Sequence, residues 1–587
     1  MTLVSRLEKI ESSGLIRLAQ GEPDLEYIFR HALVQDATYE SLLRADRRTL
    51  HQAVGRTLES LYADQLDEIA ATLAFHFEKA EELDKAVDYL IIAGESASRV
   101  YAVDEAIELF GHALKIFPPS SSSENLRHLY SQYGRVLELA GRFDAVIEVY
   151  QRMCSEGASR QDSQMELDGL MSRAILHATP SPLHHYATAT QLCEQALAIA
   201  LPLNHREAQS RIYWILMLTA LFEGHLKESV AYGEQALEIA RSLNNTEQLA
   251  FILNDLVRAY YSNGMYEKGL AANTEARVLW QKLGNLPMLV DNMATSAEYM
   301  FFSGEYEQAI AVAEEAYQIG QSIQNIWGQT FCLMMLGFAY IELGEIEQAI
   351  KANQTLLSFD PRQTFKIAQL SSRAQLADIY KEVGDLKTAY EYGLAAIDEA
   401  KDLEPTLQVA VQAGLASYDL LEGNLTEAER VMESLLELYD PENFTTFVPQ
   451  YVESARNDLL MYKGEFAAAV EALDDVLAIM DRLKIVFCRA DFMLRKANAL
   501  AALGRKEDAL QVLQEAALSA ESIRSRRILW KIYARMNELQ SELRLTTAAL
   551  ASRDKAREYV AFLCDRLPDA LCQSFLKLPA VARLFEE

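Results

Sequence analysis

Histidine is the side chain best suited to acid–base and metal chemistry near neutral pH, and it is unevenly spread along this chain. All ten histidines lie at or before His225, so the segment 226–587 contains none. The adjacent His184 and His185 would point to different faces of a helix, which argues against a shared metal ion. His31 and His51 are expected to pack against or cap helices. We therefore expect no histidine-based catalysis or metal site in most of the chain.

Paired carboxylates are a second source of chemistry, because burial can raise one pKa and create a general acid. Such pairs occur at Glu314 with Glu315 and at Asp474 with Asp475. Among 85 acidic residues they fit a solvated helix face. The sequence contains no Ser/His/Asp arrangement, no HExxH motif and no GxxxxGK[ST] loop. It therefore predicts a protein that is not an enzyme and that has no cofactor.

The composition limits the classes of partner. With 55 basic and 85 acidic residues the formal net charge is -30, which argues against direct binding to nucleic acid. The six cysteines have no zinc-ligand spacing and are expected to be buried thiols in a reducing compartment. Neither an N-terminal signal nor a long unbroken apolar run is present. The sequence therefore predicts a cytoplasmic protein without membrane contact.

An internal repeat determines which elements position the side chains. Turn glycines recur at nearly equal intervals, and an earlier copy of the repeat begins at Gly141. The regularly spaced glycines are Gly224, Gly264, Gly304, Gly344, Gly384, Gly423, Gly464 and Gly504. Small residues follow five positions later, and those that are alanine are Ala309, Ala349, Ala389, Ala428, Ala469 and Ala509. Further small residues lie seven before and twelve after the glycines, at helical spacing, so each unit is predicted to be a helical hairpin with a tight turn.

This pattern of a small residue, a glycine seven later and alanines five and twelve further on resembles the tetratricopeptide repeat. The period of 40 resembles the longer variant found in MalT-like regulators and large signalling ATPases. The resemblance covers residues 61–587 and implies an all-α, right-handed superhelical solenoid of about twelve helical hairpins. In such an array each hairpin is expected to contact only its neighbours.

Residues 1–60 depart from the repeat. A helix followed by strands at 15–19 and 26–30 indicates a winged-helix remnant, with connecting helices after it. Residues 26–54 resemble a segment of bacterial STAND-type ATPases that lies between the ATPase module and the repeat array, often downstream of a class III adenylate or guanylate cyclase or a protein kinase. The residues that match are Phe29, His31, Ala32, Gln35, Tyr39, Leu42, Arg48, Leu50 and His51. Since the P-loop motif is missing, we expect either a C-terminal fragment or a regulatory half encoded separately.

Two sets of residues are candidates for partner binding. Tyr260, Tyr340 and Tyr380 lie four before their glycines on the first helix of a hairpin, where they would form either a concave tyrosine ladder for a peptide or ordinary packing. The sign of the charge reverses over residues 522–560. The candidate basic docking patch there is Arg524, Arg526, Arg527, Lys531 and Arg535. It would bind an acidic partner or another part of a parent protein, or would be solvated surface.

The sequence thus predicts a protein–protein interaction scaffold or sensor region of a bacterial signalling protein. It would bind a partner or peptide in the concave groove and regulate an upstream ATPase or cyclase module. Two alternatives remain: the regulatory array of a LuxR-type ATPase transcription activator, and a stand-alone, chaperone-like peptide-binding scaffold.

Overall fold

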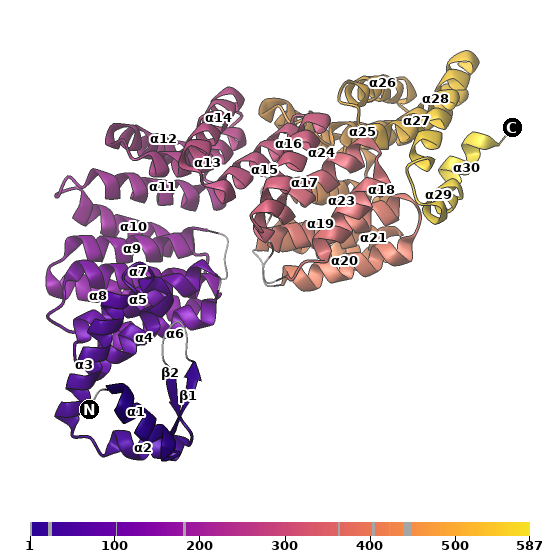
Figure 1. The fold of residues 1–587 in the computed structure, drawn as a ribbon. Coiled ribbons are helices and arrows are strands. Elements are labelled where there is room, and N and C mark those ends of the chain that lie inside the picture. The colour runs from indigo at the N-terminus through magenta and orange to yellow at the C-terminus, as the bar shows by residue number, and fades with distance from the viewer. Residues whose placement is uncertain are drawn as a thin grey trace. The chain divides into compact units, whose positions relative to one another are not determined.

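The computed structural model describes residues 3–586 except 21–25, 101, 180–182, 362–363, 365, 402–404, 422, 438 and 440–447. Thirty α-helices and one two-stranded sheet make up the described residues, which confirms the predicted all-α solenoid (Figure 1). The chain divides into two compact units, residues 1–173 and 174–587. The boundary predicted between residues 60 and 61 falls at the end of a helix inside the first unit and stays a prediction.

The first unit begins with a helix and a hairpin. Strand β1 (Ile16–Gln20) pairs antiparallel with β2 (Glu26–Phe29), with Ile16 opposite Phe29, after α1 (Leu3–Ser12). Consecutive helices then pack on one another. Their bounds are α2 (Ala32–Glu40), α3 (Arg44–Leu61), α4 (Leu66–Lys79), α5 (Leu83–Arg99), α6 (Val103–Ile116), α7 (Ser123–Leu139), α8 (Phe143–Arg160) and α9 (Ser163–Ala178), whose last residues belong to the second unit.

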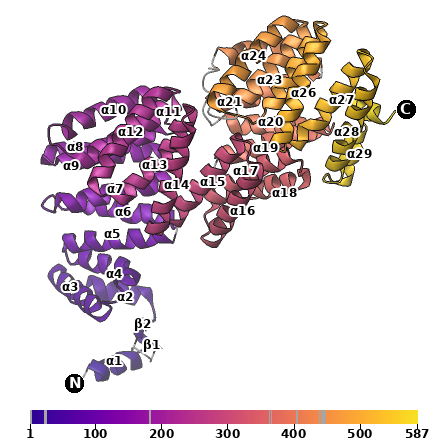
Figure 2. The ribbon, with the colours of Figure 1, turned by 90° about the horizontal axis from the view of Figure 1, so that it is seen from above.

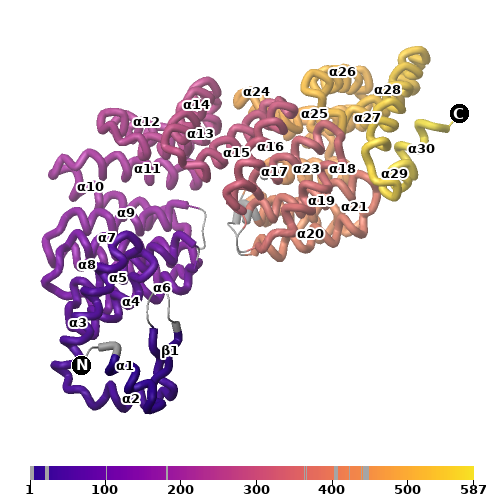
Figure 3. Tube along the Cα trace, viewed as in Figure 1, coloured from indigo at the N-terminus to yellow at the C-terminus, as the bar shows by residue number. Residues whose placement is uncertain are grey.

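The second unit is the longer part of the array, and its path can be followed along the tube in Figure 3. Its first helices are α10 (Tyr186–Ala200), α11 (Arg206–Phe222), α12 (Leu226–Leu243), α13 (Thr246–Ser262), α14 (Tyr266–Leu283), α15 (Leu286–Phe302), α16 (Tyr306–Ser322), α17 (Ile326–Leu343), α18 (Ile346–Leu357), α19 (Lys366–Glu382) and α20 (Leu386–Ala400). The later helices are α21 (Pro405–Leu421), α22 (Leu425–Leu436), α23 (Val448–Lys463), α24 (Phe466–Leu483), α25 (Arg489–Ala502), α26 (Lys506–Ser522), α27 (Arg526–Glu542), α28 (Thr546–Cys564), α29 (Asp569–Leu576) and α30 (Pro579–Phe585). Between α5 and α28 the described helices form twelve successive pairs.

Each repeat has two positions where a larger side chain would lower the stability: the turn glycine and the small residue five positions after it. All nine turn glycines have positive φ, between 66° and 83°, a conformation that strains other residues. The six alanines five positions later are at most 1% exposed. A third repeated feature was not singled out in the sequence: Asn245, Asn285 and Asn325 each cap the first helix of a hairpin by accepting from the amide three residues on.

Contacts in the second unit extend beyond neighbouring hairpins. A side chain at Gly304 would meet Ile523 at 2.6 Å, and one at Gly344 would meet Leu563 at 2.8 Å. The turns at Gly264 and Gly384 likewise approach Arg482 and Leu578, so hairpins far apart in the sequence touch. We use the name inter-turn seam for the part of this contact that joins residues 302–384 to residues 482–578. Helix α18 lies beside α28 and α29 at the seam (Figures 1 and 2). The expectation that each hairpin contacts only its neighbours is therefore wrong for this unit, because the superhelix completes a turn and meets itself.

The seam changes the expected result of overpacking one hairpin. Ala349 is fully buried on α18, so Ala349→Phe should cost about 1–3 kcal/mol of local stability. Hydrogen exchange should rise over residues 326–382 and also across the seam, over residues 526–567, because both sides share the contact. Exchange measured by mass spectrometry tests this, and an increase confined to residues 326–382 would show that the seam carries no stability.

Helix α17 has the length and mean hydropathy, 1.3, that could suit a membrane span, and no other described helix meets this test. However, 78% of this helix is buried inside the protein, as is usual for a core helix, so it is weak evidence for a span. The described residues contain no group of three or more potential metal ligands.

Candidate functional site

The predicted basic patch is engaged inside the second unit. Arg524 pairs with Glu307, Arg527 with Glu342, and Lys531 with Glu382, all acids of an earlier superhelical turn. The two remaining members have local contacts, since Arg526 stacks on the Phe562 ring and Arg535 pairs with Glu538 in its own helix. The acidic partner of Arg524, Arg527 and Lys531 is thus another part of the same chain.

Backbone and side-chain bonds reinforce the seam away from these ion pairs. The amide of Val486 donates to the Phe302 carbonyl at 3.1 Å. The amide of Glu347 donates to the Arg566 carbonyl at 2.9 Å, while the Arg566 guanidinium donates to Glu345 at 2.9 Å. Directional hydrogen bonds, as well as ion pairs, therefore hold the two superhelical turns in a fixed position relative to each other.

Closure of the superhelix leaves a partly open cavity of about 150 Å³. Its walls come mainly from the first helices of six successive hairpins, α17, α19, α21, α23, α25 and α27, with additions from α28 and α29. Part of the lining is apolar and includes Phe338, Ile341, Ile379, Phe492, Trp530 and Phe575. The remainder is charged or polar. A site with an apolar wall and a few directed polar groups is the usual form of a small-ligand pocket.

The charged part of this lining belongs to a connected network. Arg527 donates to both carboxylate oxygens of Asp491, at 3.0 and 2.8 Å. Asp378 accepts from Lys381 at 3.1 Å and from the Tyr451 hydroxyl at 3.1 Å. The remaining pairs are Arg527 with Glu342, Lys531 with Glu382, and Arg495 with Asp458. The bidentate pair of Arg527 and the bond from Tyr451 to Asp378 join side chains of different helices. Hydrogen bonds of this kind keep the charged side chains in fixed positions.

The pKa values of two carboxyl groups in this network are shifted in opposite directions. Burial alone would raise the pKa of Glu382, but Lys531, Arg527 and Lys381 outweigh it and lower the pKa to about 2. Burial raises the pKa of Glu342 even though Arg527 acts against it. Negative charge is therefore well compensated at Glu382 and less well compensated at Glu342.

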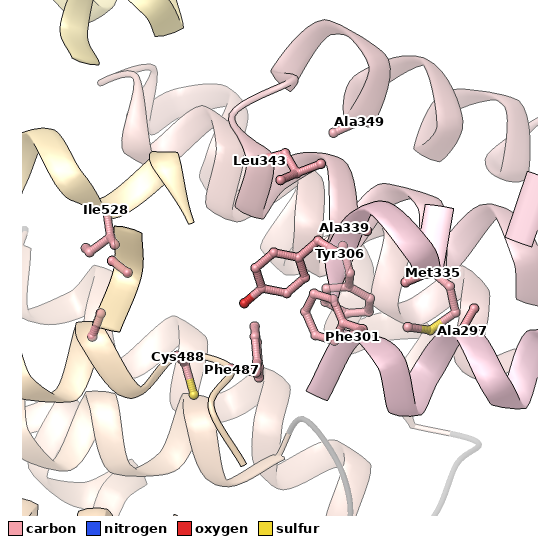
Figure 4. Close-up of a cluster of buried hydrophobic side chains, with 14 of the residues drawn as sticks. Ala297, Phe301, Tyr306, Met335, Ala339, Leu343, Ala349, Phe487, Cys488 and Ile528 are labelled. Atoms are coloured by element: carbon pink, nitrogen blue, oxygen red, sulfur yellow. The ribbon is translucent and has the colours of Figure 1, made fainter. Parts of the chain in front are cut away.

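Two buried polar atoms, one in the cavity lining and one close to lining residues, have no hydrogen-bond partner among the described residues. The Tyr306 hydroxyl is one, on a side chain that is 1% exposed, and Figure 4 shows it directed towards the segment with Phe487 and Cys488. The other is the Gln450 carbonyl oxygen, which lines the cavity. Buried polar groups without partners are uncommon and call for an explanation.

The three predicted groove tyrosines do not line the cavity. The hydroxyls of Tyr260 and Tyr340 donate to Glu234 and Glu314, on the second helix of the preceding hairpin, at 3.3 and 2.7 Å. Tyr380 stacks on Tyr392 of its own hairpin, with ring centroids 5.7 Å apart. Burial raises the pKa of Tyr260 to about 12. These contacts join helices of the same or adjacent hairpins, and no binding role follows from them.

A second polar cluster lies on α13 and α15. The Trp214 indole donates to Asp255 at 2.8 Å, and Arg258 lies 3.6 Å from Glu298. Burial raises the pKa of Asp255 to about 6 despite the indole bond. Its members pair with one another across α11, α13 and α15, so we treat the cluster as structural.

In the first unit, two residues of the STAND-like segment contact each other, and one of them, His51, also contacts His76 of the array. The Tyr39 hydroxyl lies 3.0 Å from His51 Nε2, and His51 Nδ1 lies 2.9 Å from His76 Nδ1. Burial lowers the pKa of both histidines. They act as neutral packing groups here, while His184 and His185 do not converge: one meets Glu223 and the other caps α10.

The geometry defines a tetratricopeptide-type α-solenoid that closes around a charged cavity. Residues 285–534 match the family described as the MalT-like TPR region, so this stretch is similar to MalT-like repeats. It contains α15 to α26 and about half of α27.

One solved structure shows the same kind of fold. The APC/C hetero-tetramer Cut9–Hcn1 is similar over 94% of this chain and 98% of that chain, at 14% identity and a TM-score of 0.51. A STAND protein with a tetratricopeptide-repeat sensor from Pyrococcus horikoshii is similar over 68% of this chain and 59% of that chain, at 16% identity and a TM-score of 0.43. An uncharacterized protein of Rhizobium meliloti (strain 1021) is 31% identical over 103 residues, which are 18% of this chain and 10% of that protein.

Proposed function

We propose that this chain is the sensor and interaction region of a bacterial signalling protein acting in the cytoplasm. A ligand or the end of a peptide would occupy the cavity of the second unit, and its state would regulate an upstream ATPase or cyclase module. The observation that carries the proposal is the closure of the superhelix around a cavity with a polar side. The MalT-like match of residues 285–534 supports it.

The seam provides a physical link between binding and a change of state. A ligand in the cavity touches helices from both sides of the seam, α17 and α19 on one side and α25 and α27 on the other. It therefore binds the closed form more tightly than an open form, and this difference in affinity shifts the population towards closure. Regulation requires only that the upstream module distinguishes the two forms.

The test begins with the genomic DNA immediately upstream of the first codon, where we expect a P-loop ATPase or cyclase module. That module is purified with this chain, and its turnover is compared between wild type and Arg566→Glu, which reverses the charge opposite Glu345 at the seam. We expect a change of several-fold. The matched control is Arg583→Glu on α30, whose partner Glu538 pairs, among the described residues, with Arg583 and Arg535 and not with residues 302–384. Equal turnover in all three proteins would contradict the proposal.

The chain itself is proposed to have no catalytic activity. Calorimetry with ATP should give no binding heat, because the sequence has no phosphate-binding loop. Micromolar ATP binding that ADP competes away would show that a nucleotide site exists.

A further inference from the structure

The charges of the cavity network do not balance. Its acids are Glu342, Asp378, Glu382, Asp458 and Asp491, and its bases are Lys381, Arg495, Arg527 and Lys531. Five carboxylates share four cations, so the Arg527 guanidinium serves both Asp491 and Glu342 and neither has a cation of its own. Every base already has a carboxylate partner, so an anionic ligand would have to displace one of these carboxylates. A cationic ligand would complete the balance, because a buried carboxylate without a cation of its own is costly.

The rest of the lining suits a positively charged group that carries an apolar body. Phe338, Phe492, Trp530 and Phe575 supply aromatic rings, and ring faces attract ammonium and guanidinium groups. The Gln450 side-chain oxygen lines the cavity and has no hydrogen-bond donor among the described residues. A ligand with N–H donors would satisfy the acceptor.

One glycine at the cavity has no evident structural reason to be glycine. Gly414 lies inside α21 and lines the cavity, and a Cβ added there would meet nothing within 4 Å. Glycine inside a helix costs about 0.5–1 kcal/mol relative to alanine. Its absent side chain leaves the cavity open at this point, which makes it the natural position for a blocking substitution.

We propose that this cavity binds an amphipathic organic cation, an ammonium or guanidinium group with an apolar body. The inference rests on the proposed function, since it names the ligand class of the same site. The cation lies beside the carboxylates and the Gln450 oxygen, and the apolar body lies against the aromatic wall.

Three probes of similar size and different charge test the ligand class: 2-phenylethylamine, 2-phenylethanol and 3-phenylpropionate. Calorimetry on the full chain should show the amine binding at least tenfold more tightly than the other two. Glu342→Gln removes the carboxylate that shares Arg527 with Asp491 and should reduce that preference at least threefold. The control Glu345→Gln makes the same chemical change at the seam, outside the cavity lining, and should keep the preference.

Two substitutions of different size at Gly414 test whether the ligand binds in this cavity. Gly414→Leu fills the cavity and should abolish binding of the amine, while Gly414→Ala adds one methyl group and should retain it. Circular dichroism confirms that each variant is folded. If Gly414→Leu does not fold, competition between the amine and cysteine-directed labelling of Ser417→Cys, another lining residue, locates the site instead.

The outcomes separate the ligand class from the proposed function. Equal affinities for the three probes, tightest binding of the propionate, or no binding to folded protein overturns the cation proposal. Hydrogen exchange at residues 302–306 and 485–489 is recorded in the same samples. If the alcohol or the propionate binds and protects these segments, the ligand class is wrong while the sensor function stands.

Discussion

Replacing Arg527 with methionine should lower the free energy of unfolding of the second unit by about 3–5 kcal/mol. The guanidinium is 14% exposed and donates to Asp491 and Glu342, which are buried or partly buried. Without it, both carboxylates remain in the enclosed network without their main partner. Urea unfolding followed by tryptophan fluorescence measures the loss, since Trp530 is buried on the same helix.

A matched variant on α27 distinguishes this effect from a general loss of helix stability. Arg535 pairs only with Glu538 among the described contacts of its side chain, three residues along the same helix. Arg535→Met should therefore cost under about 1 kcal/mol. Equal losses for the two variants would show that the network around Arg527 is not a principal support of the unit.

Acid should weaken the second unit through Glu382. Its folded pKa of about 2 lies below the ordinary value of 4.5, so the folded state favours the ionised form. This contributes about 3 kcal/mol that is fully present above pH 4.5 and is lost as the pH falls towards 2. Stability measured by urea unfolding between pH 6 and pH 2.5 should fall more steeply in wild type than in Glu382→Gln.

The control for this pH dependence is Glu391→Gln on α20, whose side chain is 64% exposed. Its pH profile should match that of wild type. A profile for Glu382→Gln that runs parallel to wild type would mean that the cations around Glu382 do not stabilise its charge.

The repeat could be predicted from the sequence because nine of the twelve hairpins carry a local signal at the turn. A glycine at the turn, alanine five later and apolar residues at helical spacing are enough to determine each pair of helices. The helix caps at Asn245, Asn285 and Asn325 also recur with the period of the repeat, and a search for polar periodicity would have found them.

The seam and the cavity could not be predicted in the same way. They depend on the sum of small rotations between hairpins, and no local pattern in the sequence specifies that sum. The reversal of charge near residue 524 singled out Arg527 and Lys531. Their partners Glu342 and Glu382 lie several hairpins earlier, each two before a turn glycine, among many acids that fit a solvated face.

The seam also has a consequence for synthesis on the ribosome. Residues 302–384 are made several hairpins before most of the segments that cover them, so they must remain partly uncovered while the rest is translated. During that interval the carboxylates of Glu342 and Glu382 lack their basic partners, and the apolar surroundings of Gly304 and Gly344 face solvent. Nascent chains that stop before residue 482 therefore expose a surface prone to aggregation, and a chaperone would have most to protect at this stage.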